Sequence, residues 1–534
     1  MADKRRTIGL MPLVFSAVLM QVGSAWLFGV GLTAKIAGPA AILTWLIGAI
    51  VMSFIALTIA EIAPCFPNMG GVGKYLQYSH GDLSAFLGDW AGFLALVISV
   101  IVEAVSIVQY ASSWPFEWTK QLYNIESNTL SCEGLLCASA LIFFLFILNA
   151  ISVKFLMHSI KSLGFFKIFV IVCAIALPII YIGHLSFSNF LSYKHSFAPY
   201  GWSNIWTAIA VGGVIPAFVG FQAPVSFAGE AKNPGRNIPL SILLAMLISM
   251  IVYTLLQFTF IYSFPLDSIG GNWQNLSMQA PFINLTTILG LHFLTLILFT
   301  DALVAPTTTG IILMGAAPRT LYGLHSTKHI PRFLGKRSKK TYIPINALIV
   351  SMILAIAIMW LVPSWEKVIS IVTLCYMVNF IAGPATAASL KKNARDLKRS
   401  VKIPFITFIS YIAFLVIAFL LLACGWPRTF YMSLALFGGL IIYLYYEFKV
   451  KKFKGFAVEL KSSLWIIIFM PFVSLFDYLA TDKLGGIGIF NAYSFAHILC
   501  FIAVISAIFY LMLKFSRRTN ALEKVILNQK EQQE

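Results

Sequence analysis

Residues 20–28 read MQVGSAWLF and place Gly23, Ser24 and Ala25 in the middle of a long apolar stretch that begins near Ile8. Small residues let a helix unwind, and glycine in particular adopts backbone angles that a side chain would penalise. Inside a lipid bilayer every backbone N–H and C=O needs a partner, so an unwound stretch is tolerated only where it is buried in protein or lines a wet cavity. The stretch therefore predicts a broken membrane helix.

A second apolar stretch, which begins near Ile205, is interrupted by Gly212, Gly213, Pro216, Gly220 and Pro224. Each proline removes one backbone donor from the helical ladder. The two interrupted stretches are the first and the sixth along the chain, which is the spacing of transporters built from two inverted five-helix repeats. Close helix packing or a simple proline kink explains either stretch alone, so it is their pairing that favours a binding site.

The composition agrees with a membrane protein. The chain has 534 residues, of which 59% are hydrophobic and only 11% charged, whereas soluble domains are typically about 25% charged. A water-soluble globular protein is excluded. A membrane helix needs about 20 mostly apolar residues, and fourteen such segments are predicted, beginning near Ile8, Gly38, Leu83, Glu133, Ser162, Ile205, Pro239, Ile288, Ile345, Val368, Pro404, Phe430, Ser463 and Ala496.

The net charge of +18 would fit nucleic-acid binding, but the placement of the charges argues against it. Most of the 38 Lys and Arg residues fall in alternate loops and in the tails, as the positive-inside rule requires of cytoplasmic segments. We expect a multi-pass protein of the cell (inner) membrane with both termini cytoplasmic and no nucleic-acid partner. The basic stretches 332–340 and 391–402 are candidates to meet anionic membrane lipid, although positive-inside topology alone also explains them.

Five stretches resemble, in the same order along the chain, motifs of the amino acid, polyamine and organocation transporter family. Gly23-Ser24-Ala25 resembles the family's unwound Gly-Ser-Gly. The other four stretches are Glu61–Tyr75, Val153-Lys154 with Lys167, Ala217–Phe221 leading to Gly229–Pro239, and Arg319–Tyr322. The resemblance runs from about Ile8 to Leu390, and the loop after the sixth segment is its most specific part.

Within this family the sequence looks most like the branch that contains bacterial aspartate:proton symporters. The residues that carry this narrower resemblance are Gly23–Phe28, Glu103 with Gln109-Tyr110, and Asp301 with Pro306–Gly310.

The resemblance implies an all-α polytopic membrane protein with two inverted five-helix repeats, broken helices one and six, and a LeuT-like fold. It implies a ten-helix core over residues 1–390, with the repeats at about 8–183 and 205–390. Two to four accessory C-terminal helices are expected within 391–515, followed by a cytoplasmic tail over 516–534.

The resemblance also implies an amino acid substrate, whose carboxylate and ammonium both need partners away from bulk water. Exposed N–H groups at the start of a half-helix suit the carboxylate, and we expect Gly23, Ser24 and Ala25 to supply them. Backbone C=O groups of Ala217, Phe218, Val219 and Gly220 are candidates for the ammonium. Phe218 and Phe221 are candidates for an aromatic gate, although most of the 45 phenylalanines simply pack or face lipid.

Three ionisable residues are predicted inside apolar segments, where charge is costly and function is the default hypothesis. Lys167 is implied by the resemblance to lie beside the unwound first helix and to take part in coupling. Glu103 and Asp301 are candidates to carry a proton, to pair with Lys167 or to contact the substrate. The alternatives are a lysine that reaches the interface and carboxylates satisfied by helix groups or water.

These observations favour a secondary transporter that imports an amino acid together with a proton. The narrower resemblance alone implies an acidic substrate, aspartate or glutamate, whereas a pocket near Glu103 and Asp301 would also suit a cationic amino acid or amine. An amino acid or amine exchanger of the same fold is the main alternative, and a nutrient sensor or channel is a further one. The chain contains no G-x-x-x-x-G-K-[ST], H-E-x-x-H or G-x-S-x-G motif, which argues against ATP-driven transport and against an enzyme. No cofactor or metal is predicted. Proton or sodium coupling and the oligomeric state stay open.

Overall fold

The computed structural model describes residues 8–66, 71–151, 153–183, 188–191, 196–226, 231–326, 329–335, 344–480 and 494–531. Residues 67–70 and 227–230, which belong to two of the stretches that carry the resemblance, lie outside this part of the chain. Within it, helices make up nearly all regular structure, and the one sheet is a small antiparallel hairpin in which β1 (Tyr123–Asn124) pairs with β2 (Thr129–Leu130).

The first half of the chain forms α1 (Leu10–Gln21), α2 (Ala25–Ala37), α3 (Ala41–Ile62), α4 (Leu76–Ser79), α5 (Asp82–Ala111), α6 (Glu117–Lys120), α7 (Cys132–Ile151), α8 (Val153–Ile182) and α9 (Ser188–Leu191). The second half of the core forms α10 (Ser203–Val211), α11 (Val214–Phe218), α12 (Ala223–Ser226), α13 (Pro234–Ser263), α14 (Pro281–Ile288), α15 (His292–Ser326), α16 (Ile345–Leu361), α17 (Trp365–Phe380) and α18 (Ala382–Asn393). The remaining helices are α19 (Ile406–Cys424), α20 (Arg428–Lys451), α21 (Phe456–Ala480), α22 (Phe495–Phe515) and α23 (Asn520–Glu531).

In the described part of the chain, eleven helices are long and apolar enough to cross a membrane, or twelve if the bent pair of α10 with α11 and α12 counts as one span. The fourteen predicted segments all contain helix, but two of them fall below the required length. These are α1, shortened to 12 residues by the break that follows it, and α16, with 17 residues. All four helices α19–α22 qualify as spans, which is the upper limit of the two to four accessory helices predicted. The all-α polytopic fold class is confirmed.

Both predicted helix breaks are present. The first apolar segment stops at Gln21 and resumes as α2 at Ala25. In the sixth segment, α10 ends at Val211 and the chain bends by 59° before it continues from Val214. Gly213 makes this bend with φ +85°, a left-handed conformation that glycine adopts without steric cost.

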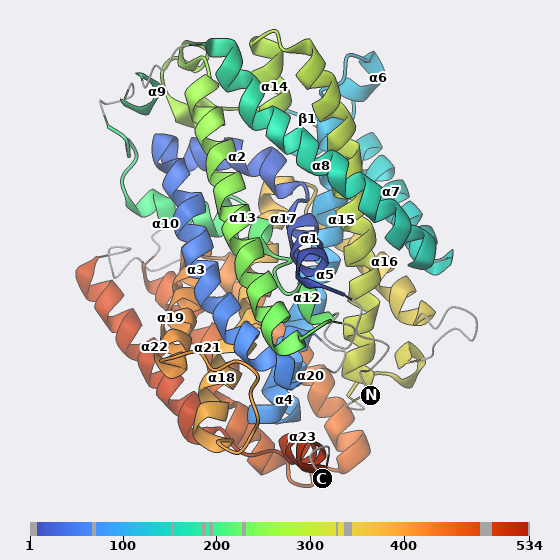
Figure 1. Ribbon diagram of the computed structural model, residues 1–534, viewed down its shortest axis with the longest axis vertical. Helices are drawn as coiled ribbons and strands as arrows, with labels where there is room; N and C mark the ends of the chain where they lie inside the picture. The colour runs from blue at the N-terminus through green and yellow to red at the C-terminus, as the bar shows by residue number, and fades with distance from the viewer. Residues whose placement is uncertain are drawn as a thin grey trace.

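The arrangement around the breaks is set by α5 and α17, the most enclosed spans. Of their most apolar windows, 89% and 94% of the residues are buried inside the protein, so neither helix presents a face to lipid. α5 packs mainly against α15 and α17. Figure 1 shows α1 and α12 in the middle of the molecule, with α6, α9 and α14 at the upper end and α4, α18 and α23 at the lower end.

Helices α19–α22 cover one side of the core, and α19 packs against α3, α10 and α18. At the lower end in Figure 1, α23 packs against α4 through the buried Leu522 and Ile526. The segment between α18 and α19 is held to the end of α3, because Arg399 pairs with the buried Glu61 carboxylate at 2.7 Å. The Ile403 N–H donates to the same carboxylate at 3.0 Å.

Candidate functional site

The break between α1 and α2 leaves backbone groups without helical partners, and side chains from three other helices satisfy them. The Lys167 ammonium on α8 donates to the Val22 carbonyl oxygen at 2.6 Å. The Thr309 hydroxyl on α15 lies 3.4 Å from the same oxygen and 3.3 Å from Lys167 Nζ. On the other side of the break, the Ser24 N–H donates to Glu103 Oε2 on α5 at 3.1 Å. Lys167 and Glu103 are therefore held at the two ends of one unwound stretch.

The sixth-segment break is tied to the first by a polar network. Gln21, the last residue of α1, donates through its side-chain amide to the Phe218 carbonyl at 2.9 Å. The Tyr253 hydroxyl on α13 lies 3.0 Å from the Gln21 carbonyl and 3.1 Å from the Ala217 carbonyl. Three of the four carbonyls expected to face a substrate ammonium, those of Ala217, Phe218 and Gly220, are already hydrogen-bonded to protein.

Gly220 explains how the two breaks approach each other so closely. Its φ is +121°, and a Cβ at this position would lie 2.9 Å from the Gln21 backbone nitrogen. Only glycine combines that angle with that proximity. The contact brings the end of α1 against the segment that follows α11.

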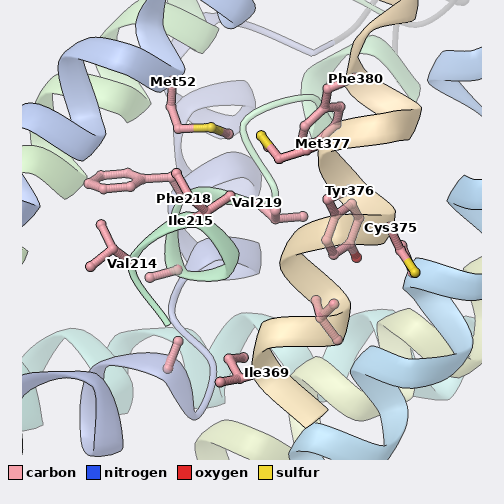
Figure 2. Packing of buried hydrophobic residues seen from close by; sticks show 14 of the residues in the cluster. Met52, Val214, Ile215, Phe218, Val219, Ile369, Cys375, Tyr376, Met377 and Phe380 are labelled. Atoms are coloured by element: carbon pink, nitrogen blue, oxygen red, sulfur yellow. The ribbon is translucent and has the colours of Figure 1, made fainter. Parts of the chain in front are cut away.

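A cavity lies between the breaks and α5, α15 and α17. It encloses about 430 Å³ of free space, counting space open to solvent. Two of its lining residues are labelled in Figure 2: Val219, which follows α11, and Tyr376 on α17. The cavity is lined by Met20, Gln21, Gly23, Ser24, Ala25, Ser99, Val102, Glu103, Pro216, Val219, Thr309, Leu313, Ile369, Val372 and Tyr376.

The predicted site residues divide into two groups. Gly23, Ser24, Ala25, Val219 and Glu103 line the cavity, while the others do not. Phe218 instead packs its ring edge-on against Tyr253 at 5.4 Å, and Phe221 packs against Phe380 at 5.3 Å. Neither ring lies at the cavity surface in this structure.

Asp301 stands apart from both breaks, eight residues before Thr309 on α15. It is completely buried, and neither carboxylate oxygen has a hydrogen-bond partner among the described residues. Its charge acts on Lys167 and on Tyr110. A buried carboxyl group without partners is costly to ionise, so a position of this kind favours the protonated form.

Aromatic rings lie between this cavity and a second one, whose lining includes residues of α2, α5, α14 and α17. Phe28 stacks on Trp365 with centroids 4.7 Å apart and meets Tyr110 edge-on at 4.6 Å. Phe28 and Trp365 line the second cavity, together with Lys35 and Glu366. Ile369, one helical turn after Trp365, already lines the first. The three rings of Phe28, Tyr110 and Trp365, here called the aromatic plug, thus lie between the two cavities.

The sequence prediction missed Gln21, Tyr253 and the aromatic plug. A signal for the network was available, because Ser249, Tyr253 and Gln257 are spaced four residues apart and so share one face of α13. Ser249 donates to Gln21 and Gln257 donates to the Val30 carbonyl. No local signal identifies the plug, since its members come from α2, α5 and α17.

Comparison with known proteins places these features in a family context. The family model described as amino acid permease matches residues 13–435. The chain is 35% identical over 515 residues to the glutamate/serine transporter AimA of Bacillus subtilis, covering 96% of this chain and 94% of the relative. It is 30% identical to the aspartate-proton symporter of the same organism, covering 91% and 92%. It is 23% identical to the branched-chain amino acid permease BcaP, covering 84% and 94%.

Proposed function

Since the chain belongs to the amino acid permease family, we propose that it imports an acidic amino acid, aspartate or glutamate, by proton symport. It is a multi-pass membrane transporter and not an enzyme. The observation that carries the proposal is the Lys167 and Glu103 pair, which holds the two ends of the unwound α1–α2 stretch at the edge of a buried cavity. Ionisable groups joined to a cavity provide a physical link between protonation and binding.

The α-carboxylate of the substrate is assigned to the start of α2. Of the backbone N–H groups predicted for it, that of Gly23 already donates to the Gln21 carbonyl at 3.0 Å. Those of Ser24 and Ala25, with the positive end of the helix dipole, favour an anion there. The ammonium is assigned to the break of the sixth segment. Of the backbone groups predicted for it, Val219 lines the cavity, whereas the Gly220 carbonyl accepts from the Ala223 N–H at 2.9 Å.

The side-chain carboxylate of an acidic substrate has hydroxyl partners on the far wall of the same cavity. Ser99 and Tyr376 lie there, 3.3 Å apart through their hydroxyl oxygens, and Thr309 lies near Lys167. Names of two relatives support this substrate class, since one is a glutamate/serine transporter and the other an aspartate-proton symporter.

Lys167, Glu103 and Asp301 are proposed to couple the proton to the substrate. All three are at least nine-tenths buried, and the charges of both carboxyl groups act on Lys167. A proton added to either carboxyl group therefore changes the electrostatic energy of Lys167. In the same proposal, Phe218 and Phe221 reach the substrate only after the segment that follows α11 moves.

We further propose that both termini face the cytoplasm in the cell (inner) membrane. The last described helix, α23, docks at the same end of the molecule as α4 and α18 (Figure 1). This end holds the basic segment 391–402, as the positive-inside rule expects of a cytoplasmic face.

Uptake of labelled amino acids into proteoliposomes in sodium-free buffer tests the function. We expect an imposed inward proton gradient to stimulate uptake of aspartate or glutamate, and Lys167→Ala to abolish that stimulation. Lys120→Ala, which removes an exposed lysine, is the matched control and should behave as the wild type. Uptake that requires internal amino acid and ignores the gradient would instead identify an exchanger.

A further inference from the structure

We propose that Glu103 and the substrate's α-carboxylate compete for the same backbone donor, the Ser24 N–H, and that protonation of Glu103 is what admits the substrate. This inference rests on the proposed function and specifies how the proton and the substrate are linked. It gives Glu103 a role distinct from those of Lys167 and Asp301, because only the Glu103 carboxylate occupies the start of α2.

The geometry at the start of α2 carries the proposal. Glu103 Oε2 accepts the Ser24 N–H at 3.1 Å, and a Cβ on Gly23 would lie only 2.6 Å from Glu103 Oε1. The carboxylate is thus pressed directly against the unwound backbone. Gly23, Ser24 and Glu103 all line the cavity, so the donor that Glu103 engages is one that a ligand in the cavity would reach.

A second feature marks this position as a ligand site. The Ser24 hydroxyl is completely buried and lines the same cavity; it interacts with the Glu103 carboxylate, but no well-formed hydrogen bond satisfies it among the described residues. A buried polar group without a well-formed hydrogen bond is destabilising. A substrate carboxylate has two oxygens and would satisfy both the Ser24 hydroxyl and the Ser24 N–H.

Two carboxylates are not accommodated together at this point. Like charges in a poorly solvated site disfavour double ionisation, so one group must leave or take up a proton. A protonated Glu103 no longer offers a charge-assisted acceptor to the Ser24 N–H, which weakens its hold on the helix start. Its new O–H becomes a donor to the incoming carboxylate. Addition of one proton therefore converts Glu103 from a competitor into a partner.

Among the described residues, no cation forms a hydrogen-bonded ion pair with Glu103. The charge of Lys167 on α8 acts on Glu103, but the Lys167 ammonium directs its hydrogen bonds to Val22 and Thr309. From the other packed helices, the groups whose ionisation Glu103 influences are Tyr253 on α13 and Tyr376 on α17, both neutral near pH 7. Asp301 on α15 acts on Lys167 and is an acidic group that offers Glu103 no positive charge. Protonation is thus the available route to a neutral Glu103.

Charge balance follows from this scheme. An acidic amino acid of charge −1 and one proton on Glu103 enter together without net charge, whereas a neutral amino acid and one proton carry +1. Membrane potential should accordingly have little effect on aspartate uptake but accelerate uptake of any neutral substrate. The difference is a consequence of a single proton site that is emptied and filled once in each cycle.

The test compares Glu103→Gln with the wild type by binding of labelled aspartate at several pH values. In the wild type, the Kd for aspartate should weaken by up to about tenfold for each pH unit above the ionisation of Glu103. In Glu103→Gln, the Kd should change by less than about twofold between pH 5.5 and 7.5, because the neutral amide resembles the protonated acid. Counterflow of aspartate should persist in this variant, while accumulation driven by a proton gradient should be lost. Glu117→Gln, at an exposed glutamate, is the matched control and should keep the wild-type pH dependence.

Two results would overturn the proposal while leaving the proposed function intact. One is a Glu103→Gln protein that transports aspartate and keeps the wild-type dependence of Kd on pH. The other is a folded Glu103→Gln protein that binds no aspartate at any pH, which would make the carboxyl group an obligatory ligand. Should the variant not fold, proton uptake by the wild type decides the matter. Aspartate added to wild-type protein in weakly buffered solution at pH 7.5 should remove about one proton per bound molecule, and no proton uptake contradicts the proposal. A wild type that neither binds nor transports any amino acid would refute the proposed function itself.

Discussion

The Lys167 ammonium on α8 takes the place of a helical N–H by donating a 2.6 Å hydrogen bond to the Val22 carbonyl. The bond joins a side chain that is 2% exposed to the first backbone group of the α1–α2 break. In this way a charge buried in the membrane interior stabilises an unwound helix, and the helix in turn provides the partner that makes the buried lysine tolerable.

Replacement of Lys167 should therefore reduce transport by disturbing the geometry of the α1–α2 break. In Lys167→Ala the Val22 carbonyl loses its nearest donor, at a cost of about 1–3 kcal/mol, and the break no longer holds one geometry. We expect gradient-driven uptake to fall by at least about tenfold, since ~1.4 kcal/mol corresponds to one order of magnitude. A variant that takes up substrate at the wild-type rate would show that the bond is dispensable.

Gly220→Ala should be strongly destabilising. The new Cβ would meet the Gln21 backbone nitrogen at 2.9 Å in a residue with φ +121°, and strained backbone of this kind costs on the order of 1–3 kcal/mol. Thermal unfolding in detergent should show a lower midpoint. Gly438→Ala, at a helical glycine of α20 with no neighbour within 4 Å of the added atom, should leave the midpoint unchanged or raise it. Equal midpoints for the two variants would refute the close approach of the breaks.

Phe28→Ala should open the aromatic plug. A cysteine introduced at Ile369, which lines the cavity and is 1% exposed, should react slowly with a membrane-impermeant maleimide added from the outer side. The reaction should become at least about tenfold faster when Phe28 is alanine, because the stacked contact with Trp365 is lost. The measurement needs a background in which the exposed cysteines Cys132, Cys137 and Cys500 are replaced by serine. As a control, Ile125→Cys, at an exposed position, should react equally fast whether residue 28 is phenylalanine or alanine. If Phe28→Ala leaves the labelling rate of the cysteine at position 369 unchanged, the aromatic plug is not what keeps the reagent out of the cavity.

Arg399→Ala should unfold more easily than the wild type, because it leaves the Glu61 carboxylate buried without its cation. Glu61 is 1% exposed and Arg399 8%, and loss of one partner of such a pair costs about 3–5 kcal/mol. Replacing both residues by leucine should recover much of the lost stability, since neither charge is then stranded. Thermal unfolding of the single and double variants tests this, with Lys120→Ala as the exposed control. A double variant that is no more stable than Arg399→Ala would contradict the argument.

His80 should make stability depend on pH in mildly acidic solution. Burial is the main cause that lowers the pKa of His80 to about 4, and the ring lies 2.8 Å from the Ser79 hydroxyl and 3.2 Å from the Met512 carbonyl. The unfolded chain therefore binds the proton more readily, with a pKa near 6.5. The contribution of neutral His80 to the free energy of unfolding is fully present above about pH 6.5, and this contribution declines as the pH falls toward 4.

Near pH 4, the loss of unfolding free energy that is due to His80 is on the order of 3 kcal/mol. The unfolding midpoint of the wild type should fall between pH 6.5 and 4.5 more steeply than that of His80→Gln, whose side chain does not titrate. Parallel curves for the two proteins would show that His80 is protonated in the folded state.

Much of the fold was predictable because it depends on local properties of the chain. The run of apolar residues around Gly23-Ser24-Ala25 predicts both a membrane helix and its interruption, and the structure places the break at residues 22–24. The glycines and prolines after Ile205 similarly predict the bend at Gly213. The number of spans was less certain, since α1 is shortened by the break and α16 falls just below the length of a full span.

The candidate site was only partly predictable. Glu103 was identified because a charged residue in an apolar segment is conspicuous, and the structure puts it in the cavity wall. Phe218 was selected from its place beside the second break, but helical direction turns its ring toward Tyr253 and Trp45. The hydrogen bonds that Gln21 and Tyr253 make to this segment join residues more than thirty positions apart, so no local pattern predicts them.

The sequence alone therefore determined the membrane class, the positions of the two breaks and the identity of the buried charges, since each follows from the solvation of a short segment. Only the tertiary structure decided which groups meet. Ser24 and Glu103 are 79 residues apart, and Val22 and Lys167 are 145 apart. Their pairing depends on how α5 and α8 pack against the unwound backbone, because an unpaired N–H or C=O buried in the membrane takes the partner that packing brings within reach.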